Sequence, residues 1–292
     1  MARARGQAAY RNQLNPGQKA VLWVFMGFVA LIMVLPMWNV VVVSTSTTLS
    51  SSRSGFLLWW DQFSIEGFRY VFQISKLGRP FLNSLLVTTV GTTIQVLLSS
   101  IAGYVLIQRD LPFKGLITSF VMITMMIPGD LTMISIYQLN RSLHLLNSYT
   151  GLIVNGLISG FSILLMRNFF EGIPFALSES ARIDGASELR TFAGIYMPIS
   201  LPGLATVFFM EYVAKWNTIT IPATLLTREE LYTLPLKLKM MILSTDSTSG
   251  TAQIPNNAIM AAIIITAAPL LVIYVFAQRF LLSGLNLGAT KE

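Results

Sequence analysis

Long apolar runs separated by polar segments dominate the chain. A helix needs about 20 predominantly apolar residues to cross the hydrocarbon core of a bilayer. Transmembrane strands are disfavoured, because the runs show no period-two alternation and exceed the length of a barrel strand. The predicted fold class is therefore all-α integral membrane, with six transmembrane helices at 20–43, 81–107, 116–139, 147–166, 200–222 and 258–278.

The composition agrees with that pattern. The 292 residues are 53% hydrophobic and 11% charged, whereas soluble domains carry about 25% charged residues. Cysteine is absent and His144 is the single histidine, which excludes a disulfide framework and metal sites built from several Cys or His. The net charge of +7 comes from basic residues between the apolar runs, which we interpret as membrane-flanking charges. No nucleic-acid partner is expected.

The distribution of Lys and Arg predicts the orientation in the membrane. The N-terminal segment 1–19 holds basic residues and no acidic one, so it is expected in the cytoplasm. Six crossings over a transmembrane domain at 20–281 return the tail, 282–292, to the same side. A cleaved signal peptide fits the first run less well, because that run exceeds the usual apolar region of about 7–15 residues.

The loop at 167–199 has the pattern of a helix–turn–helix at the membrane surface. Pro174 suits the first turn of a short helix, since it has a fixed φ and no N–H to lose. Gly185 is placed to end that helix in a left-handed conformation, and a second helix is predicted from Ser187. The residues alone leave two interpretations open, which are docking into a groove of another protein and an ordinary amphipathic interfacial loop.

The same loop carries a spaced motif: Glu179-Ser180-Ala181, three residues, Gly185, nine residues, and then Ile195-Tyr196-Met197-Pro198. This motif resembles the EAA loop, E-A-A-x3-G-x9-I-x-L-P, of binding-protein-dependent ABC importer permeases. Ser180 replaces the second Ala of the pattern and Met197 replaces its Leu. Both positions tolerate a residue of this different size. The resemblance covers most of the chain and is nearest the carbohydrate-uptake (MalG-like) branch, LplC/YtcP-type subgroup, to which 180–186, Trp216-Asn217 and 284–291 are similar.

The resemblance implies a MetI/MalG-like permease fold in which this loop couples transport to ATP hydrolysis. It implies as partners a second permease in a heterodimer, two ATP-binding subunits that carry ATP and Mg, and an extracytoplasmic solute-binding protein that delivers an oligosaccharide. The chain is then not an enzyme and binds no cofactor itself, and it spans the bacterial cytoplasmic (inner) membrane. The implied ATPase-coupling residues are Glu179, Ser180, Ala181, Asp184, Gly185, Ala186, Ile195 and Pro198.

Ionisable residues within predicted spans are costly and usually face an interior or a cavity. Glu211 and Lys215 lie four residues apart in the fifth span, acid first, and Asp130 follows a Pro-Gly pair in the third. An open alternative is a neutralised Glu211–Lys215 pair that only fixes packing. The positive charge of Lys215 favours an acidic sugar as cargo. This preference is weak, because Glu211 largely cancels the charge of Lys215. The functional interpretation is a translocation path lined by Glu211, Lys215, Trp216 and Asn217, with Trp216 stacking on a sugar ring. For Asp130, a place in this path and a structural role at the helix break both stay open.

Two other classes of protein fit the sequence less well. A secondary transporter is expected to show internal repeats with broken helices in matching positions, and the sequence shows no repeat. An intramembrane enzyme needs a His/Glu zinc motif or a nucleophile elbow, and the sequence has neither. The sequence also lacks a GxxxxGK[ST] phosphate loop, so ATP hydrolysis is expected in a partner.

Overall fold

The computed structural model describes residues 15–53, 55–246 and 254–289. Within these ranges the protein is helical and contains no strand, only an isolated bridge between Ser46 and Phe63. The prediction of an all-α fold is therefore confirmed. The elements are, in chain order, α1 (Pro16–Ser44), α2 (Thr48–Ser51), α3 (Glu66–Gln73), α4 (Gly78–Ile107), α5 (Lys114–Met126), η1 (Gly129–Thr132), α6 (Met133–Ser142), α7 (Tyr149–Val154), α8 (Gly160–Glu171), α9 (Phe175–Ile183), α10 (Glu188–Thr191), η2 (Phe192–Tyr196), α11 (Met197–Ile199), α12 (Leu201–Asn217), α13 (Thr220–Leu225), η3 (Glu229–Leu231), α14 (Leu234–Asp246) and α15 (Asn256–Ala289).

Within the described ranges, three helices are long and apolar enough to cross a bilayer, namely α1, α4 and the part of α15 up to Phe280. A fourth span results if α12 is joined to the stretch Glu188–Ile199, from which it is bent by 80°. The three long helices coincide with the predicted ones at 20–43, 81–107 and 258–278, although α15 continues to Ala289, through most of the predicted tail. The count of six spans stays a prediction.

Each of the runs predicted at 116–139, 147–166 and 200–222 is broken in the structure, the first next to the Pro128-Gly129 pair that interrupts it in the sequence. The first breaks at Ile127, whose extended backbone (φ −78°, ψ 116°) is the conformation favoured before a proline. The second breaks between α7 and α8, where Ser159 caps α8 by accepting a hydrogen bond from Ser162 N. The third breaks at Thr218, which is extended between α12 and α13. Each of these three predicted spans is thus divided into separate helices by a short non-helical segment.

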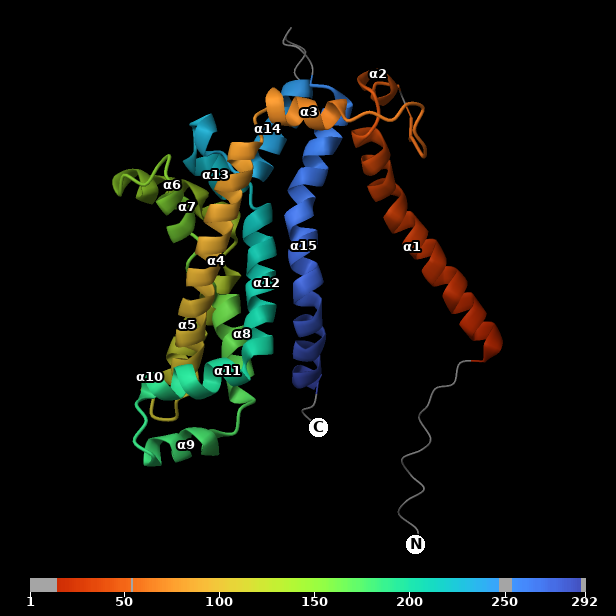
Figure 1. The fold of residues 1–292 in the computed structure, drawn as a ribbon. Helices are drawn as coiled ribbons and strands as arrows, with labels where there is room; N and C mark the ends of the chain where they lie inside the picture. Colours follow the sequence, from red (N-terminus) through yellow and green to blue (C-terminus); the bar gives the residue numbers. More distant parts are fainter. Residues whose placement is uncertain (1–14, 54, 247–253, 290–292) are drawn as a thin grey trace.

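The central helix, α4, packs against α8 and α12 through small and polar side chains (Figure 1). Small residues let membrane helices approach closely, and their polar atoms bond within the protein rather than face lipid. At Gly103, an added Cβ would lie 2.8 Å from the backbone nitrogen of Arg167 on α8, so only glycine fits there. The buried polar residues of α4 are Asn83, Ser84, Thr88, Thr92, Gln95, Ser99 and Ser100.

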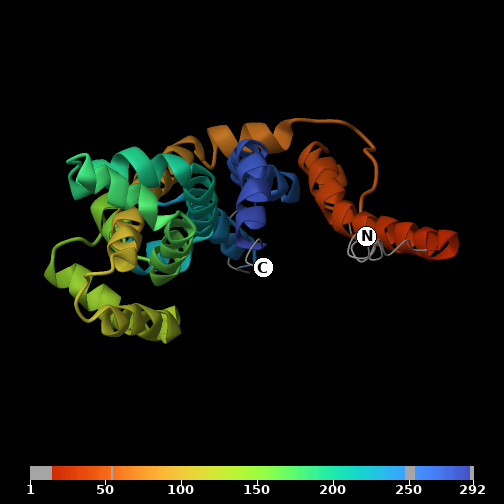
Figure 2. The same cartoon turned by 90° about the horizontal axis from the view of Figure 1, so that it is seen from below.

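The N-terminal helix α1 stands apart from the bundle and joins it only near its C-terminal end (Figures 1 and 2). There Trp38 Nε1 donates a hydrogen bond to Leu58 O at 2.8 Å, and Asn39 Nδ2 donates one to Leu57 O at 2.9 Å. The most apolar 18-residue stretch of α1 has no residue buried by the rest of the described chain. Its apolar surface is therefore left for lipid or for another protein.

The two ends of the molecule differ in what they carry (Figure 1). The start of α1, the end of α15 and the segment α9–α10 lie at one end, which we call the hairpin end. Helices α2, α3 and α14 lie at the opposite end. This agrees with a topology in which both chain ends share the side of the 167–199 loop. That this side is the cytoplasm stays a prediction.

We expect Gly103→Ala to lower the free energy of unfolding by about 1–3 kcal/mol, because the new methyl group collides with rigid backbone. The matched control is Gly115→Ala on the exposed side of α5, where nothing lies within 4 Å of the added Cβ. The control should raise stability by up to about 1 kcal/mol. Unfolding of both variants in detergent measures the difference, and equal stability would contradict the close packing of α4 on α8.

Candidate functional site

The segment 174–191 folds as the predicted helix–turn–helix. Pro174 is the N-terminal cap of α9, and Gly185 follows the helix with φ +79°, in the left-handed region that favours glycine. Ala186 N donates to Ala181 O at 2.9 Å and Gly185 N donates to Arg182 O at 3.1 Å, which is the paired bonding of a Schellman motif. Ser187 then caps α10. Both helix ends are satisfied within the segment, so the turn is well defined.

We call this segment, 174–191, the coupling hairpin. Two of its large apolar side chains point away from the protein, since Ile183 is 86% exposed and Leu189 is 74% exposed. Of the residues assigned to ATPase coupling, Glu179, Ser180, Asp184 and Gly185 are exposed, while Ala181 and Ala186 are half-buried. The hairpin therefore presents an apolar surface with charged edges at the end of the molecule (Figure 1). Sequence reasoning did not single out Leu189, although it predicted the helix from Ser187 to which Leu189 belongs.

Two of the assigned residues lie outside this surface. Ile195 is half-buried and packs against the cluster around Tyr104 and Tyr196. Pro198 is exposed but belongs to α11, after the hairpin. They therefore shape the return of the chain into the bundle rather than the exposed face of the hairpin.

Side chains at the end of α4 and in the two residues that follow it hold the coupling hairpin in place. Tyr104 Oη donates to Glu188 Oε2 at 2.7 Å, and Arg182 Nε donates to Glu188 Oε1 at 2.9 Å. Arg182 also donates to Gln108 Oε1 at 2.9 Å. At the outer face of the hairpin, Arg109 lies over the Phe175 ring at 4.0 Å. Sequence reasoning missed these residues of α4, because nothing local in the sequence shows that they meet the hairpin.

The charges in this network reinforce each other. The hydrogen bond from Tyr104 and the neighbouring Arg182 guanidinium lower the pKa of Glu188, while the Glu188 carboxylate raises the pKa of Arg182. A carboxyl whose pKa is lowered on folding stabilises the fold above its unfolded pKa, and this contribution is lost as the pH falls through the folded value. The anchor is therefore complete at neutral pH and weakens only in acid.

An aromatic cluster backs the hairpin. Tyr104 contacts Tyr196 edge-on with ring centres 4.9 Å apart, and Phe170 contacts both rings edge-on, at 6.5 Å and 5.7 Å. Phe192 closes the cluster from the π-helical turn η2. Edge-to-face contacts of this kind contribute about 0.5–1.5 kcal/mol each beyond the area they bury. Helices α4 and α8 and the turn after the hairpin are thereby held as one unit.

We expect Tyr104→Phe to loosen the coupling hairpin without disturbing the aromatic cluster. The change keeps the ring but removes the hydrogen bond to the Glu188 carboxylate, which costs about 1–2 kcal/mol. Amide hydrogen exchange over 175–191 should become about 5–30-fold faster. Tyr137→Phe, on the exposed part of α6, is the control and should leave this exchange unchanged. Unaltered exchange in Tyr104→Phe would show that other contacts hold the hairpin.

The two charged residues of α12 are used differently from the predicted pair. The Glu211 carboxylate accepts a hydrogen bond from Ser162 Oγ on α8, and Lys215 Nζ donates one to the carbonyl of Gly156. Among the described residues, no ion pair joins Glu211 to Lys215. The two side chains therefore connect α12 to both sides of the break between α7 and α8.

The other residues assigned to the path fall in different surroundings. Trp216 is 1% exposed, its Nε1 donates to Thr266 O at 3.0 Å, and its ring stacks on Tyr212 and meets Phe81 edge-on. Its ring faces are thus occupied by protein packing in this structure. Asn217 is exposed, and its side chain donates to Val213 O. Asp130 belongs to η1, and its side chain lies outside what the structure describes.

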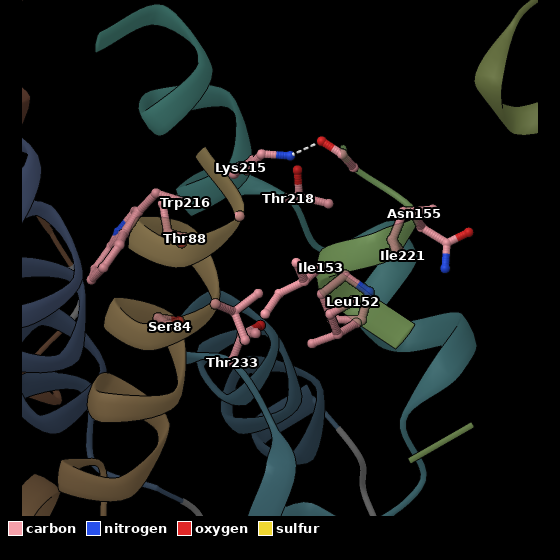
Figure 3. A pocket seen from close by; sticks show the side chains of 14 residues that line it. Ser84, Thr88, Leu152, Ile153, Asn155, Lys215, Trp216, Thr218, Ile221 and Thr233 are labelled. Carbon is pink, nitrogen blue, oxygen red and sulfur yellow. Dashed lines mark hydrogen bonds between the residues drawn. The ribbon is translucent and has the colours of Figure 1, made fainter. Parts of the chain in front are cut away.

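A pocket of about 110 Å³ lies between α4, α7, α12 and α13, toward the end opposite the coupling hairpin. Figure 3 shows Lys215 and Thr218 at one end of it and Ser84 and Thr233 at the other, with Leu152 and Ile153 between them. Nowhere in the described ranges, the pocket included, do three or more His, Asp or Glu residues gather where a metal ion could be held. This intramembrane pocket is therefore the second candidate site.

Comparison with known proteins assigns the class. The fold and the exposed hairpin define a membrane transport permease, and residues 95–286 match the family described as binding-protein-dependent transport system inner membrane component. The chain belongs to this family, which confirms the resemblance carried by the loop motif.

Named relatives span nearly the whole chain. It is 32% identical to the polygalacturonan/rhamnogalacturonan transport system permease protein YtcP of Bacillus subtilis (strain 168), over 93% of this chain and 97% of that protein. It is 27% identical to the arabinooligosaccharides transport system permease protein AraQ of Halalkalibacterium halodurans, over 96% and 99%. A chain of a crystal structure of a bacterial ABC transporter involved in alginate import has the same fold, with a TM-score of 0.80, 24% identity and coverage of 90% and 96%.

Proposed function

We propose that this chain is a membrane-spanning permease subunit of an ATP-driven importer that takes up an oligosaccharide from an extracytoplasmic solute-binding protein. The observation that carries the proposal is the coupling hairpin, which is rigidly built and yet leaves Ile183 and Leu189 exposed. A large apolar side chain at the tip of a fixed turn is typical of a surface that docks on another protein. The bacterial cytoplasmic membrane is the proposed location, with both chain ends in the cytoplasm.

The proposed partners on the hairpin side are two ATP-binding subunits, which hold ATP and Mg and perform the hydrolysis. Glu179, Ser180, Ala181 and the turn at Gly185 lie on the exposed hairpin and supply its polar contacts. Because the network around Glu188 fixes the hairpin to α4, movement of a docked subunit is passed to the transmembrane helices as a rigid-body motion. Alternating access then follows from movement of whole helices.

The proposed partner within the membrane is a second permease. The apolar surface of α1 is uncovered along most of its length, and a single chain leaves it with no protein contact there. Lipid and the second subunit together cover this surface in the proposal. The two permeases then enclose the path between them.

The proposed cargo is an oligosaccharide, on the strength of two relatives that are named as transporters of polysaccharide-derived or arabino-oligosaccharide substrates. The broken helices support a path through the bundle, because backbone freed at a break is tolerated only inside protein or along a cavity. Lys215 and Glu211 face such a break, and they are proposed to line the path together with Asn217 and Asp130. Trp216 is proposed to border the path as a packed wall.

Purification of the tagged chain in mild detergent, with identification of the proteins that come with it, tests the assembly. We expect an ATPase and a second permease, and uptake of oligosaccharide into proteoliposomes only with ATP and the binding protein. Recovery of the chain alone, with solute uptake that needs no ATP, would replace the proposal with a secondary transporter.

The double variant Ile183→Ser/Leu189→Ser tests the hairpin. Both side chains are exposed, so folding should be unaffected, while loss of two apolar anchors should lower recovery of the ATPase and ATP-dependent uptake at least tenfold. Leu49→Ser, at an equally exposed position on α2 at the opposite end, is the control and should retain the ATPase. Normal recovery and uptake in the double variant would refute the docking role.

A further inference from the structure

The intramembrane pocket holds a cation, Lys215, that forms no direct ion pair within the described ranges. Lys215 Nζ donates to a backbone carbonyl, that of Gly156, and the nearby Glu211 carboxylate is directed to Ser162 instead. No described carboxylate forms an ion pair with Lys215. A partly buried ammonium that touches a carbonyl and no carboxylate can accept an anionic group directly, and Glu211 one helical turn away acts on it only through space.

The glycine at position 156 makes room for this cation. Gly91 on α4 lines the pocket, and a Cβ added there would touch Lys215 Cδ at 3.6 Å. At Gly156, an added Cβ would collide with Lys215 Nζ itself. The backbone at the break after α7 is therefore shaped around the ammonium group. An ammonium fitted against Gly156 is a built feature of the pocket rather than a side chain left at a surface.

The far end of the same pocket carries an unused polar group. Thr233 is 6% exposed and lines the pocket, and its Oγ1 atom has no hydrogen-bond partner among the described residues. Buried polar atoms normally have a partner, so an unpaired hydroxyl indicates where a ligand can bond. Leu152 and Ile153 form an apolar wall between Thr233 and Lys215 (Figure 3).

A sugar ring that bears a carboxylate matches this arrangement. A sugar ring that bears a carboxylate has a negative charge on one edge, hydroxyls on the opposite edge and apolar C–H faces between them. The pocket offers, in the same order, a cation, an apolar wall and a hydroxyl acceptor or donor. One water needs about 10–15 Å³ of free space, so a pocket of about 110 Å³ has room for one sugar unit.

We propose that this pocket is a subsite for an acidic sugar unit, in which Lys215 pairs with the carboxylate and Thr233 bonds a hydroxyl. The inference rests on the proposed function and deepens it, because it names the charge of the cargo and the residues that recognise it. The carboxylate would replace the Gly156 carbonyl as the main partner of Lys215. Neutral sugars would leave the cation unpaired and would be bound less well.

The test uses the complex purified through a tag on this chain and reconstituted in lipid nanodiscs. The probes are tri-galacturonate and its methyl ester, which have equal length and differ in charge. We expect the wild type to bind the acid at least tenfold more tightly than the ester. Lys215→Met should weaken binding of the acid at least tenfold and change binding of the ester less than twofold, while Lys215→Arg should keep the acid within about threefold.

Two further variants keep the result interpretable. Gly156→Ala retains the charge but displaces the ammonium, and the atom it meets ends a flexible side chain, so the protein should fold and bind the acid about 3–10-fold more weakly. Lys19→Met, at an exposed lysine in the first turn of α1, removes the same charge far from the pocket and should change neither affinity.

The possible results distinguish failure of the acidic subsite from failure of the proposed importer function. Equal affinity of the wild type for acid and ester, failure to bind the acid, or equal losses for both probes in Lys215→Met would overturn the acidic subsite. ATP-dependent uptake of an oligosaccharide by the same complex would then leave the proposed function intact. Absence of any oligosaccharide uptake would overturn the proposed function itself.

Discussion

The close contact of α4 with α8 and α12 is the constraint on which the rest of the structure depends. Helices in a bilayer gain little from burying apolar surface, because lipid is as apolar as a leucine side chain. They associate instead where small residues allow close packing and where polar atoms find partners. Gly103 against α8 provides the close packing, and Asn83 and Ser84 on α4 provide polar contacts, to Glu230 O and from Leu234 N. The apolar residues of α4 are then free to face lipid, as Leu86 and Leu97 do.

Both candidate sites are attached to this one helix. Near its C-terminal end, Tyr104 and Gln108 hold the coupling hairpin, and closer to its N-terminal end Ser84 and Thr88 line the intramembrane pocket. A rigid helix between two sites carries a displacement from one to the other without any deformation of its own. In the proposed importer, α4 is therefore the element that relates docking at the hairpin to the shape of the pocket.

The breaks in the other helices complement this rigidity. Where α7 ends before α8, the carbonyl of Gly156 is satisfied by Lys215, and the start of α8 is tied to α12 through Ser162 and Glu211. One bond joins α12 to the turn after α7 and the other joins α12 to α8, so together they hold this arrangement of the break. Lys215 and Glu211 therefore stabilise the helix break. In the proposed importer, a ligand group can replace the protein group that each of them binds.

Local features of the sequence predicted a large part of this picture. The three long helices follow from uninterrupted apolar runs, and the turn of the hairpin follows from Gly185, because only that residue suits the left-handed backbone at a helix end. The family follows from the spacing of the loop motif. The break in the run at 116–139 follows from Pro128, which disfavours helical backbone at the residue before it.

What the sequence determined is therefore the class of protein, the long helices and the coupling hairpin, since each is fixed by residues close together in the chain. The tertiary structure alone decided that Lys215 and Glu211 turn to different helices, that Trp216 is packed within the protein, and that Tyr104 anchors Glu188. These contacts join residues about 50 to 84 positions apart. Partners at such separations are chosen by how helices pack, which no local pattern records.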